Sequence, residues 1–210
     1  MAQTSTKLPV RRTYREATDE SLLLWYREEG DIEAFETLVH RYEKPLFSYL
    51  LRFLHSVSLA EDVFQATFLR FHEKCHSFTE GRQVRPWIYS IATNLAIDVL
   101  RKEGRHHKVS LDDERTESGA RAGTLSDLLR SSQPSPLEQL ESREEAAWTR
   151  RAVDALPEHL RVIVLLAYFQ GLKFQEVAEI LQIPLGTVKS RLHKALLTLH
   201  SAWRRNHRSQ

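Results

Sequence analysis

The string FQEVAEILQIPLGTVKSRL, from Phe174 to Leu192, limits the fold of this chain more than any other segment. Counted from Phe174, its fifth residue is the small Ala178 and its fifteenth is the branched, apolar Val188. Both suit a helix-turn-helix, in which the fifth position must be small because the second helix crosses closely there. The turn position holds Gln182 where glycine is usual, and glutamine adopts that turn at some conformational cost. The spacing therefore predicts a helix-turn-helix.

The second helix of this motif combines an apolar stripe with a basic side. Val188, Leu192 and Ala195 recur at helical spacing and would bury one face. From residue 186 to residue 210 there are six Lys or Arg, three His and no acid, although the net charge of the 210-residue chain is only +2. A positive footprint confined to one end predicts contact with a DNA major groove. The alternative is a solvated helix face with a frayed basic tail.

Six side chains of the second helix are expected to face the DNA. These are Thr187, Lys189, Ser190, Arg191, His193 and Lys194. Arg191 is the best candidate for a bidentate contact to guanine, whereas Lys189 and Lys194 are better suited to phosphates.

Helical signals fill two blocks of the chain, and nothing in the first block resembles a strand. Between the blocks lies a polar stretch of mixed charge that is almost free of aromatics. We predict an all-α fold with two helical domains joined by a flexible linker. The predicted units are a disordered N-terminal tail at 1–17, a first domain at 18–103, the linker at 104–135, a second domain at 136–203 and a basic tail at 204–210.

Capping residues predict where the helices of the first block begin and end. Asp19 is expected to cap one helix, which Gly30 ends, and Asp31 is expected to start the next. Ser58, with Glu61 three residues later, has the pattern of a capping box for a third helix.

Several functional classes are disfavoured by composition and spacing. The single cysteine, Cys75, excludes an internal disulfide and suits a reducing cytoplasm. No apolar run approaches the roughly 18 residues that a membrane span requires, so we expect no membrane insertion. His72, Cys75 and His76 offer three metal ligands with no fourth nearby, so we expect no metal site. Without a glycine-rich phosphate loop or a Ser, His and Asp arrangement, we also expect no cofactor and no catalysis.

The order of the segments resembles the extracytoplasmic-function class of bacterial RNA polymerase sigma factors, a class of the sigma-70 family. The resemblance covers nearly the whole chain except residues 1–17 and the linker. In region two of that family it rests on the strings GDIEAFETLVHRYEKPLFSYL, LAEDVFQATFLRFHEK and RPWIYSIATNLAIDVLRK. In region four it rests on ALPEHLRVIVLLAYFQGLKFQEVAEILQIPLGTVKSRLHKAL.

The resemblance assigns core polymerase binding to the string EDVFQ. Asp62 and Gln65 match the family positions that contact the coiled coil of the largest polymerase subunit. Two polar groups three residues apart share one helix face, which agrees with such a contact. Ala66 stands where the family commonly has Glu, so binding is expected to be weaker or to use other contacts. The alternative is an ordinary amphipathic helix without a partner.

The resemblance also assigns promoter melting to the end of the first domain. Phe78 and Asn94 match the family positions that build a pocket for an extruded base, which needs a stacking surface and hydrogen-bonding groups. Arg82 and Arg85 are then expected to hold the adjoining phosphates of the −10 region. The alternative for Phe78 is a loop aromatic packed on the core.

The function implied by the resemblance is that of a dissociable initiation subunit in the bacterial cytoplasm. It would bind core RNA polymerase through the coiled coil and the flap, melt the −10 element and read the −35 element, and an anti-sigma factor is an expected further partner. One alternative is a helix-turn-helix regulator that binds duplex operators without engaging polymerase. Another is an interaction protein that titrates polymerase or an inhibitor without opening promoters.

Overall fold

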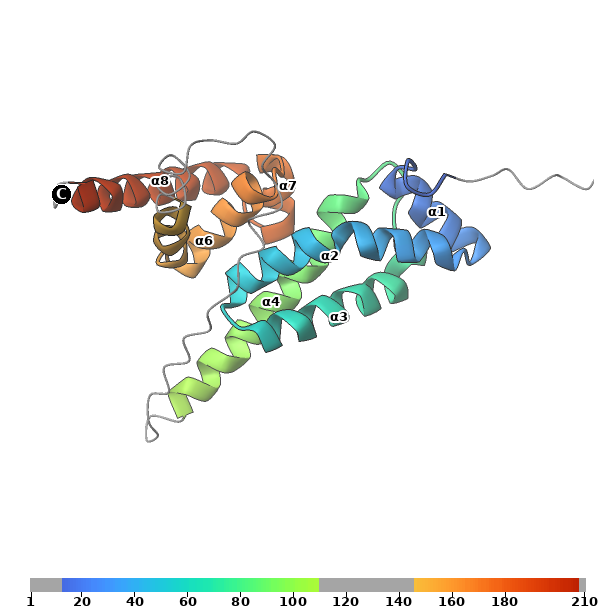
Figure 1. The fold of residues 1–210 in the computed structure, drawn as a ribbon, viewed down its shortest axis with the longest axis horizontal. Helices are drawn as coiled ribbons and strands as arrows, with labels where there is room; N and C mark the ends of the chain where they lie inside the picture. The colour runs from blue at the N-terminus through green and yellow to red at the C-terminus, as the bar shows by residue number, and fades with distance from the viewer. Residues whose placement is uncertain (1–12, 110–145, 208–210) are drawn as a thin grey trace, which may run out of the picture.

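The computed structural model describes residues 13–109 and 146–207, and every regular element in these two ranges is helical (Figure 1). The first range contains α1 (Asp19–Glu29), α2 (Ile32–Leu54), α3 (Val57–Lys74), the 3₁₀ turn η1 (Cys75–Ser77) and α4 (Val84–Val109). The second range contains a helix over 146–154, then α6 (Glu158–Val164), the π-helical turn η3 (Leu165–Phe169), α7 (Phe174–Leu181) and α8 (Leu185–His207). The prediction of an all-α fold is confirmed for the described residues.

Two predicted boundaries fall inside helices. The helix α4 continues to Val109 and α8 continues to His207, beyond the predicted domain ends at 103 and 203. Residues 1–12, 110–145 and 208–210 lie outside the described residues, and with them most of the predicted N-terminal tail and linker.

Of the three predicted N-caps, Asp31 is confirmed, whereas Asp19 and Ser58 are wrong by one and two residues. The side chain that accepts from the first turn of α1 is Thr18, one residue before the predicted Asp19. Asp31 caps α2 as predicted, through its contact with the Ala34 N–H. The cap of α3 is Ser56, whose extended backbone lets its Oγ accept from the Leu59 N–H at 3.3 Å. The predicted capping residue, Ser58, lies inside α3.

The core of the first helical group, residues 13–109, is rich in aromatic side chains. Tyr49 of α2 and Tyr89 of α4 are fully buried, with ring centroids 5.5 Å apart in an edge-to-face arrangement. The Tyr49 hydroxyl shares a hydrogen bond of 2.8 Å with Oγ1 of the buried Thr93. Because a buried hydroxyl needs a partner, this pair fixes how α2 and α4 pack together.

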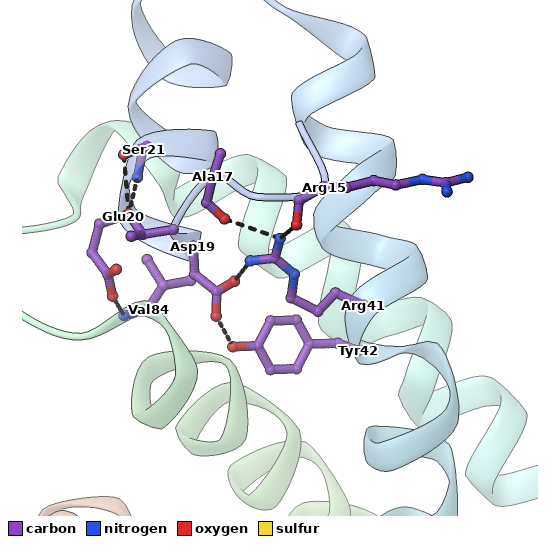
Figure 2. Close-up of polar contacts among 9 residues, drawn as sticks. Arg15, Ala17, Asp19, Glu20, Ser21, Arg41, Tyr42 and Val84 are labelled. Atoms are coloured by element: carbon purple, nitrogen blue, oxygen red, sulfur yellow. Dashed lines mark hydrogen bonds and ion pairs between the residues drawn. The ribbon is translucent and has the colours of Figure 1, made fainter. Parts of the chain in front are cut away.

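Polar contacts of α1 tie it to both α2 and α4 (Figure 2). Asp19 accepts hydrogen bonds from the Arg41 guanidinium and the Tyr42 hydroxyl, both on α2. Its neighbour Glu20 accepts from the backbone N–H of Val84 at 3.0 Å. Val84 is the first residue of α4, so a side chain of α1 satisfies one of the free N–H groups at that helix start.

The second helical group, residues 146–207, ends in the predicted helix-turn-helix. Ala178 and Val188 are both buried where α7 and α8 meet. Gln182 occupies the turn in the left-handed conformation, with φ at 53°. This is the conformation that makes glycine usual at that position.

The two helical groups are in contact, with α7 against α4 and both η3 and α6 against α2. In Figure 1 the second group lies beside the first. Its last helix, α8, extends away from the first group and projects beyond the other helices of its own group. No helix within residues 13–109 and 146–207 is long and apolar enough to cross a membrane.

Candidate functional site

The α3 helix presents the predicted polymerase-binding residues to solvent. Asp62 and Gln65 are both exposed, and their spacing of three residues places them on one face of the helix. The apolar side of α3, with Val63, Thr67 and Phe71, is buried in the core. The two polar side chains are therefore free to contact another molecule.

An exposed leucine lies on the same face and was missed from the sequence. Leu69 follows Gln65 by four residues and is 60% exposed. It falls outside the apolar stripe that packs on the core, and this departure from periodicity is the signal that marks it. A large apolar side chain beside two polar groups gives the face the mixed character of a protein-binding surface.

Phe78 lies in the loop between η1 and α4 and is partly buried. Its ring packs against Trp87 with centroids 4.8 Å apart, and Trp87 in turn packs on Phe71 at 4.9 Å. The Arg27 guanidinium donates to the Phe78 carbonyl at 3.4 Å and to the Glu80 carboxylate at 2.8 Å. The ring of Phe78 therefore packs on core aromatics, as the alternative reading expects, while its loop borders a pocket.

That pocket has a volume of about 300 Å³ and lies between α1 and the loop. The α1 helix contributes Glu20, Leu23 and Arg27 among others, and the loop contributes Phe78 and Arg82. This size is at the lower end for ligand sites, and the lining offers an aromatic ring, apolar surface and charged groups. The contribution of α1 was not foreseen from the sequence.

The four predicted −10 residues do not form one cluster. Phe78 and Arg82 line the pocket. Asn94 is exposed on α4 and does not line it, since it follows Val84 by ten residues, or about 15 Å of helix. Arg85 is directed elsewhere, because its guanidinium donates to the backbone carbonyl of Gln170 at 2.5 Å in the second helical group.

The recognition helix α8 buries one stripe and exposes its basic side. Val188, Leu192 and Ala195 are buried, as their spacing predicts. Of the six residues predicted to face DNA, four are exposed and two are partly buried. The exposed residues are Lys189, Ser190, His193 and Lys194, and the partly buried ones are Thr187 and Arg191.

The first turns of α8 leave their cations available. The Ser190 hydroxyl donates to the Thr187 carbonyl at 3.1 Å within the helix, so it is engaged locally. Among the described side chains, no carboxylate forms an ion pair with Lys189, Arg191 or Lys194. A helix whose first turns present these three cations and no acid is suited to a polyanionic groove.

The residues of the string HEKCH, which were considered as metal ligands, make contacts within the first helical group. The His72 Nδ1 and the Tyr26 hydroxyl are 2.5 Å apart, and Cys75 is buried. Across the described part of the chain, no group of three or more His, Cys, Asp or Glu side chains is placed to hold a metal ion.

These features describe a helical protein with an exposed face of mixed polar and apolar character on its first helical group and an exposed basic helix on its second. Comparison with known families gives the same division, since residues 38–106 match Sigma-70 region 2 and residues 146–199 match Sigma-70, region 4. The chain belongs to the sigma-70 family of RNA polymerase sigma factors, within its extracytoplasmic-function (ECF) class. The first helical group is called region 2 below, and the second is called region 4.

Curated relatives extend over most of the chain. It is 32% identical over 167 residues to the ECF RNA polymerase sigma factor SigW of Bacillus subtilis, a match that covers 80% of this chain and 87% of SigW. It is 33% identical over 172 residues to the ECF RNA polymerase sigma-E factor of Escherichia coli K12, which covers 80% and 85% of the two chains.

Two solved structures share the fold. The structure of CnrH in complex with the cytosolic domain of CnrY matches with a TM-score of 0.61 at 20% identity, over 89% of this chain and 97% of that one. The sigma factor RpoE of Bartonella quintana, in complex with the anti-sigma factor NepR, matches with a TM-score of 0.60 at 22% identity, over 81% and 96%.

Proposed function

We propose that this sigma factor docks on core polymerase through α3, captures a melted base beside Phe78 and reads the upstream promoter element with α8. The observation that carries the proposal is the spatial separation of three surfaces of different chemistry. They are the polar and apolar face of α3, the pocket between α1 and the Phe78 loop, and the exposed basic side of α8.

Docking on polymerase is supported by the composition of the α3 face. Asp62 supplies a carboxylate and Gln65 an amide, while Leu69 supplies apolar area that is removed from water on binding. Because Ala66 is small and half-buried, Leu69 is the residue that provides contact area on this face. We expect it to compensate for the missing Glu.

Capture of a base is supported by the pocket and by how α1 holds it. Arg27 binds the loop at Phe78 and Glu80, and Glu20 binds the N–H of Val84 where the loop joins α4. The two side chains are thus positioning residues that hold both ends of the loop. A stacking ring held in place before DNA arrives lowers the entropic cost of capturing an unstacked base.

Reading of the −35 element is supported by the recognition helix. Arg191 is the candidate for a bidentate contact to guanine, and Lys189 and Lys194 are the candidates for phosphate contacts. An anti-sigma factor is a proposed further partner, because the structural neighbour from Bartonella quintana was solved with one.

Run-off transcription with purified core polymerase tests the proposal. The template is a pool of genomic promoter fragments from the host, transcribed with and without the protein. We expect specific transcripts that require the protein and are lost in the Asp62→Ala/Gln65→Ala variant. The Glu36→Ala variant is the matched control, because Glu36 is an exposed carboxylate on α2 and does not belong to α3.

The alternative function predicts a different pattern. A regulator that acts on duplex operators would yield no transcripts and would bind DNA with an affinity that core polymerase does not change. That result would replace the initiation factor with an operator-binding protein.

A further inference from the structure

Arg27 of α1 gathers two carboxylates in the lining of the pocket beside Phe78. Its Nη2 donates to Oε1 of Glu28 at 3.0 Å and to Oε1 of Glu80 at 2.8 Å, so acids from two different elements converge on one nitrogen. The hydrogen bond to Glu80, followed by that to Glu28, raises the pKa of Arg27, which therefore stays charged. The Arg27 side chain is only 14% exposed, so it is a fixed anchor for the two carboxylates.

The contacts within the lining leave several acceptors free. An ionised carboxylate has two oxygens that only accept hydrogen bonds. Glu28 and Glu80 each use one oxygen on Arg27, and Glu20, the third acid of the lining, uses one on the Val84 N–H. Among the residues that the structure describes, none bonds to the second oxygen of these three side chains. The pocket therefore offers acceptors to a ligand.

The charges of the lining favour a ligand that presents N–H groups. Three carboxylates lie in the lining together with two guanidinium groups, those of Arg27 and Arg82. Arg27 is already paired with two of the acids, and Arg82 is exposed and is the proposed phosphate ligand. The potential inside the pocket is consequently negative, which attracts the positively polarised edge of a base and repels an edge of carbonyl oxygens.

The bases of DNA differ in whether they have such an edge. Cytosine, adenine and guanine each have an exocyclic amino group, whereas thymine has none. A carboxylate accepts readily from an amino group, as Glu and Asp do from N4 of cytosine. Two acceptors held close together can bind both N–H bonds of one amino group. Thymine would instead bring a carbonyl oxygen against the carboxylates, which leaves acceptors facing acceptors.

We propose that Glu28 of α1 is a specificity-determining residue that acts with Glu80 to select an extruded base with an amino group and to reject thymine. Phe78 supplies the stacking face, and Arg27 is the positioning residue that orients the two carboxylates. This inference rests on the proposed function, because it takes the ligand of the pocket to be a base of melted promoter DNA. It goes further by assigning part of the base recognition to α1, which lies outside the Phe78 loop.

The captured position is located first, with the full-length protein bound to core polymerase. The DNA is a fluorescent duplex with the sequence of a promoter obtained by run-off transcription, and its melted segment is left unpaired. Each unpaired base is replaced in turn by an abasic site. The captured base is the one whose loss weakens binding to wild type but no longer weakens binding to Phe78→Ala.

Three pyrimidines at that position separate the effect of the amino group from that of the ring. Cytosine carries the amino group, 2-pyrimidinone is the same ring without it, and uracil carries a carbonyl oxygen in its place. We expect cytosine to bind about tenfold more tightly than uracil, because a matched contact to a base edge typically discriminates by about that factor or more. The affinity for 2-pyrimidinone should lie between the two.

Glu28→Gln tests the residue directly. Glutamine keeps the size of the side chain but replaces one carboxylate oxygen by an amide NH2 that can donate to a carbonyl. We expect the ratio of cytosine to uracil affinity to fall from about tenfold to about twofold or less. Loss of positioning alone would weaken both complexes by the same factor and leave this ratio unchanged.

Glu36→Gln is the matched control, because Glu36 is an exposed carboxylate on α2 that does not line the pocket. It should keep the tenfold ratio. Circular dichroism of both variants confirms that the helices remain folded.

Two results would overturn the inference while the proposed function stands. They are equal binding of cytosine, 2-pyrimidinone and uracil by wild type, and a ratio that Glu28→Gln leaves at its wild-type value. Failure of the proposed function is distinct, because no transcripts would appear or no unpaired position would depend on Phe78. In that case the assignment of Glu28 would fall with it.

Discussion

In region 2 the loop that carries Phe78 is held by side chains from a distant part of the chain, whereas in region 4 the turn that leads into the recognition helix is held by hydrogen bonds between near neighbours. Arg27 reaches the Phe78 carbonyl across 51 positions, and Glu20 reaches the Val84 N–H across 64. In region 4 the Ile183 N–H bonds to the Ala178 carbonyl. The N–H groups of Thr187 and Val188 both bond to Pro184.

This difference determines how a mutation elsewhere in each region affects the DNA-reading surface of that region. The recognition helix also packs on α6, so it remains correctly placed as long as region 4 as a whole is folded. A loop fixed by a remote helix can lose its shape while the rest of region 2 stays folded. We therefore expect stability and DNA reading to be coupled closely in region 4 and loosely in region 2.

The largest effect is expected from Leu192→Ala in region 4. Leu192 is 5% exposed, and deletion of a buried leucine side chain costs about 2–5 kcal/mol. Thermal unfolding followed by circular dichroism should show region 4 unfolding earlier, with loss of DNA binding, while region 2 unfolds as before. Leu197→Ala is the control, because Leu197 lies on the same helix and is 54% exposed. Equal unfolding curves for the two variants would contradict the assigned helix face.

The next effect is expected from Thr93→Val in the core of region 2. This change leaves the buried Tyr49 hydroxyl without its partner, at a cost of about 1–3 kcal/mol. Tyr49→Phe alone should cost a similar amount, and the double variant should recover most of the loss because both polar groups are then gone. Urea unfolding of the four proteins gives the coupling energy. Additive losses would show that the two hydroxyls do not depend on each other.

Local patterns explain why much of region 4 was predictable from the sequence. The small residue at Ala178, the buried Val188 and the left-handed turn at Gln182 were all predicted, and all depend on residues a few positions apart. The exposed face of α3 followed from periodicity in the same way. Even so, a pattern of residue types does not distinguish neighbouring serines, and the α3 cap lies at Ser56 instead of Ser58.

Tertiary contacts account for what the sequence did not predict. The resemblance assigned Arg85 to DNA phosphates, and the structure adds a contact that no local pattern signals, in which Arg85 donates to the carbonyl of Gln170, 85 positions away. The positioning roles of Glu20 and Arg27 also depend on how α1 packs, and no local spacing signals them. Such pairings arise only when distant segments fold together.

Glu20→Ala tests the loose coupling expected in region 2. It removes the carboxylate that accepts from the Val84 N–H, and loss of a helix-capping contact costs about 1 kcal/mol. We expect permanganate reactivity of the melted promoter to fall several-fold, with polymerase affinity unchanged, since α3 is not altered. Glu36→Ala should change neither measurement. A parallel loss of polymerase affinity would show that α1 supports the whole of region 2 and has no special role at the loop.

The smallest effects are expected from His55→Gly and Gln182→Gly, which are matched between the two regions. Each residue ends a helix in the left-handed conformation, with φ at 56° for His55 and 53° for Gln182. Relief of that backbone strain, offset by the greater freedom of glycine in the unfolded chain, should stabilise each region by about 0.5–1 kcal/mol in urea unfolding. Both positions act through their own helix ends, so the gains should be similar. A gain confined to region 4 would mean that the turn at His55 is also held by contacts from outside its helix.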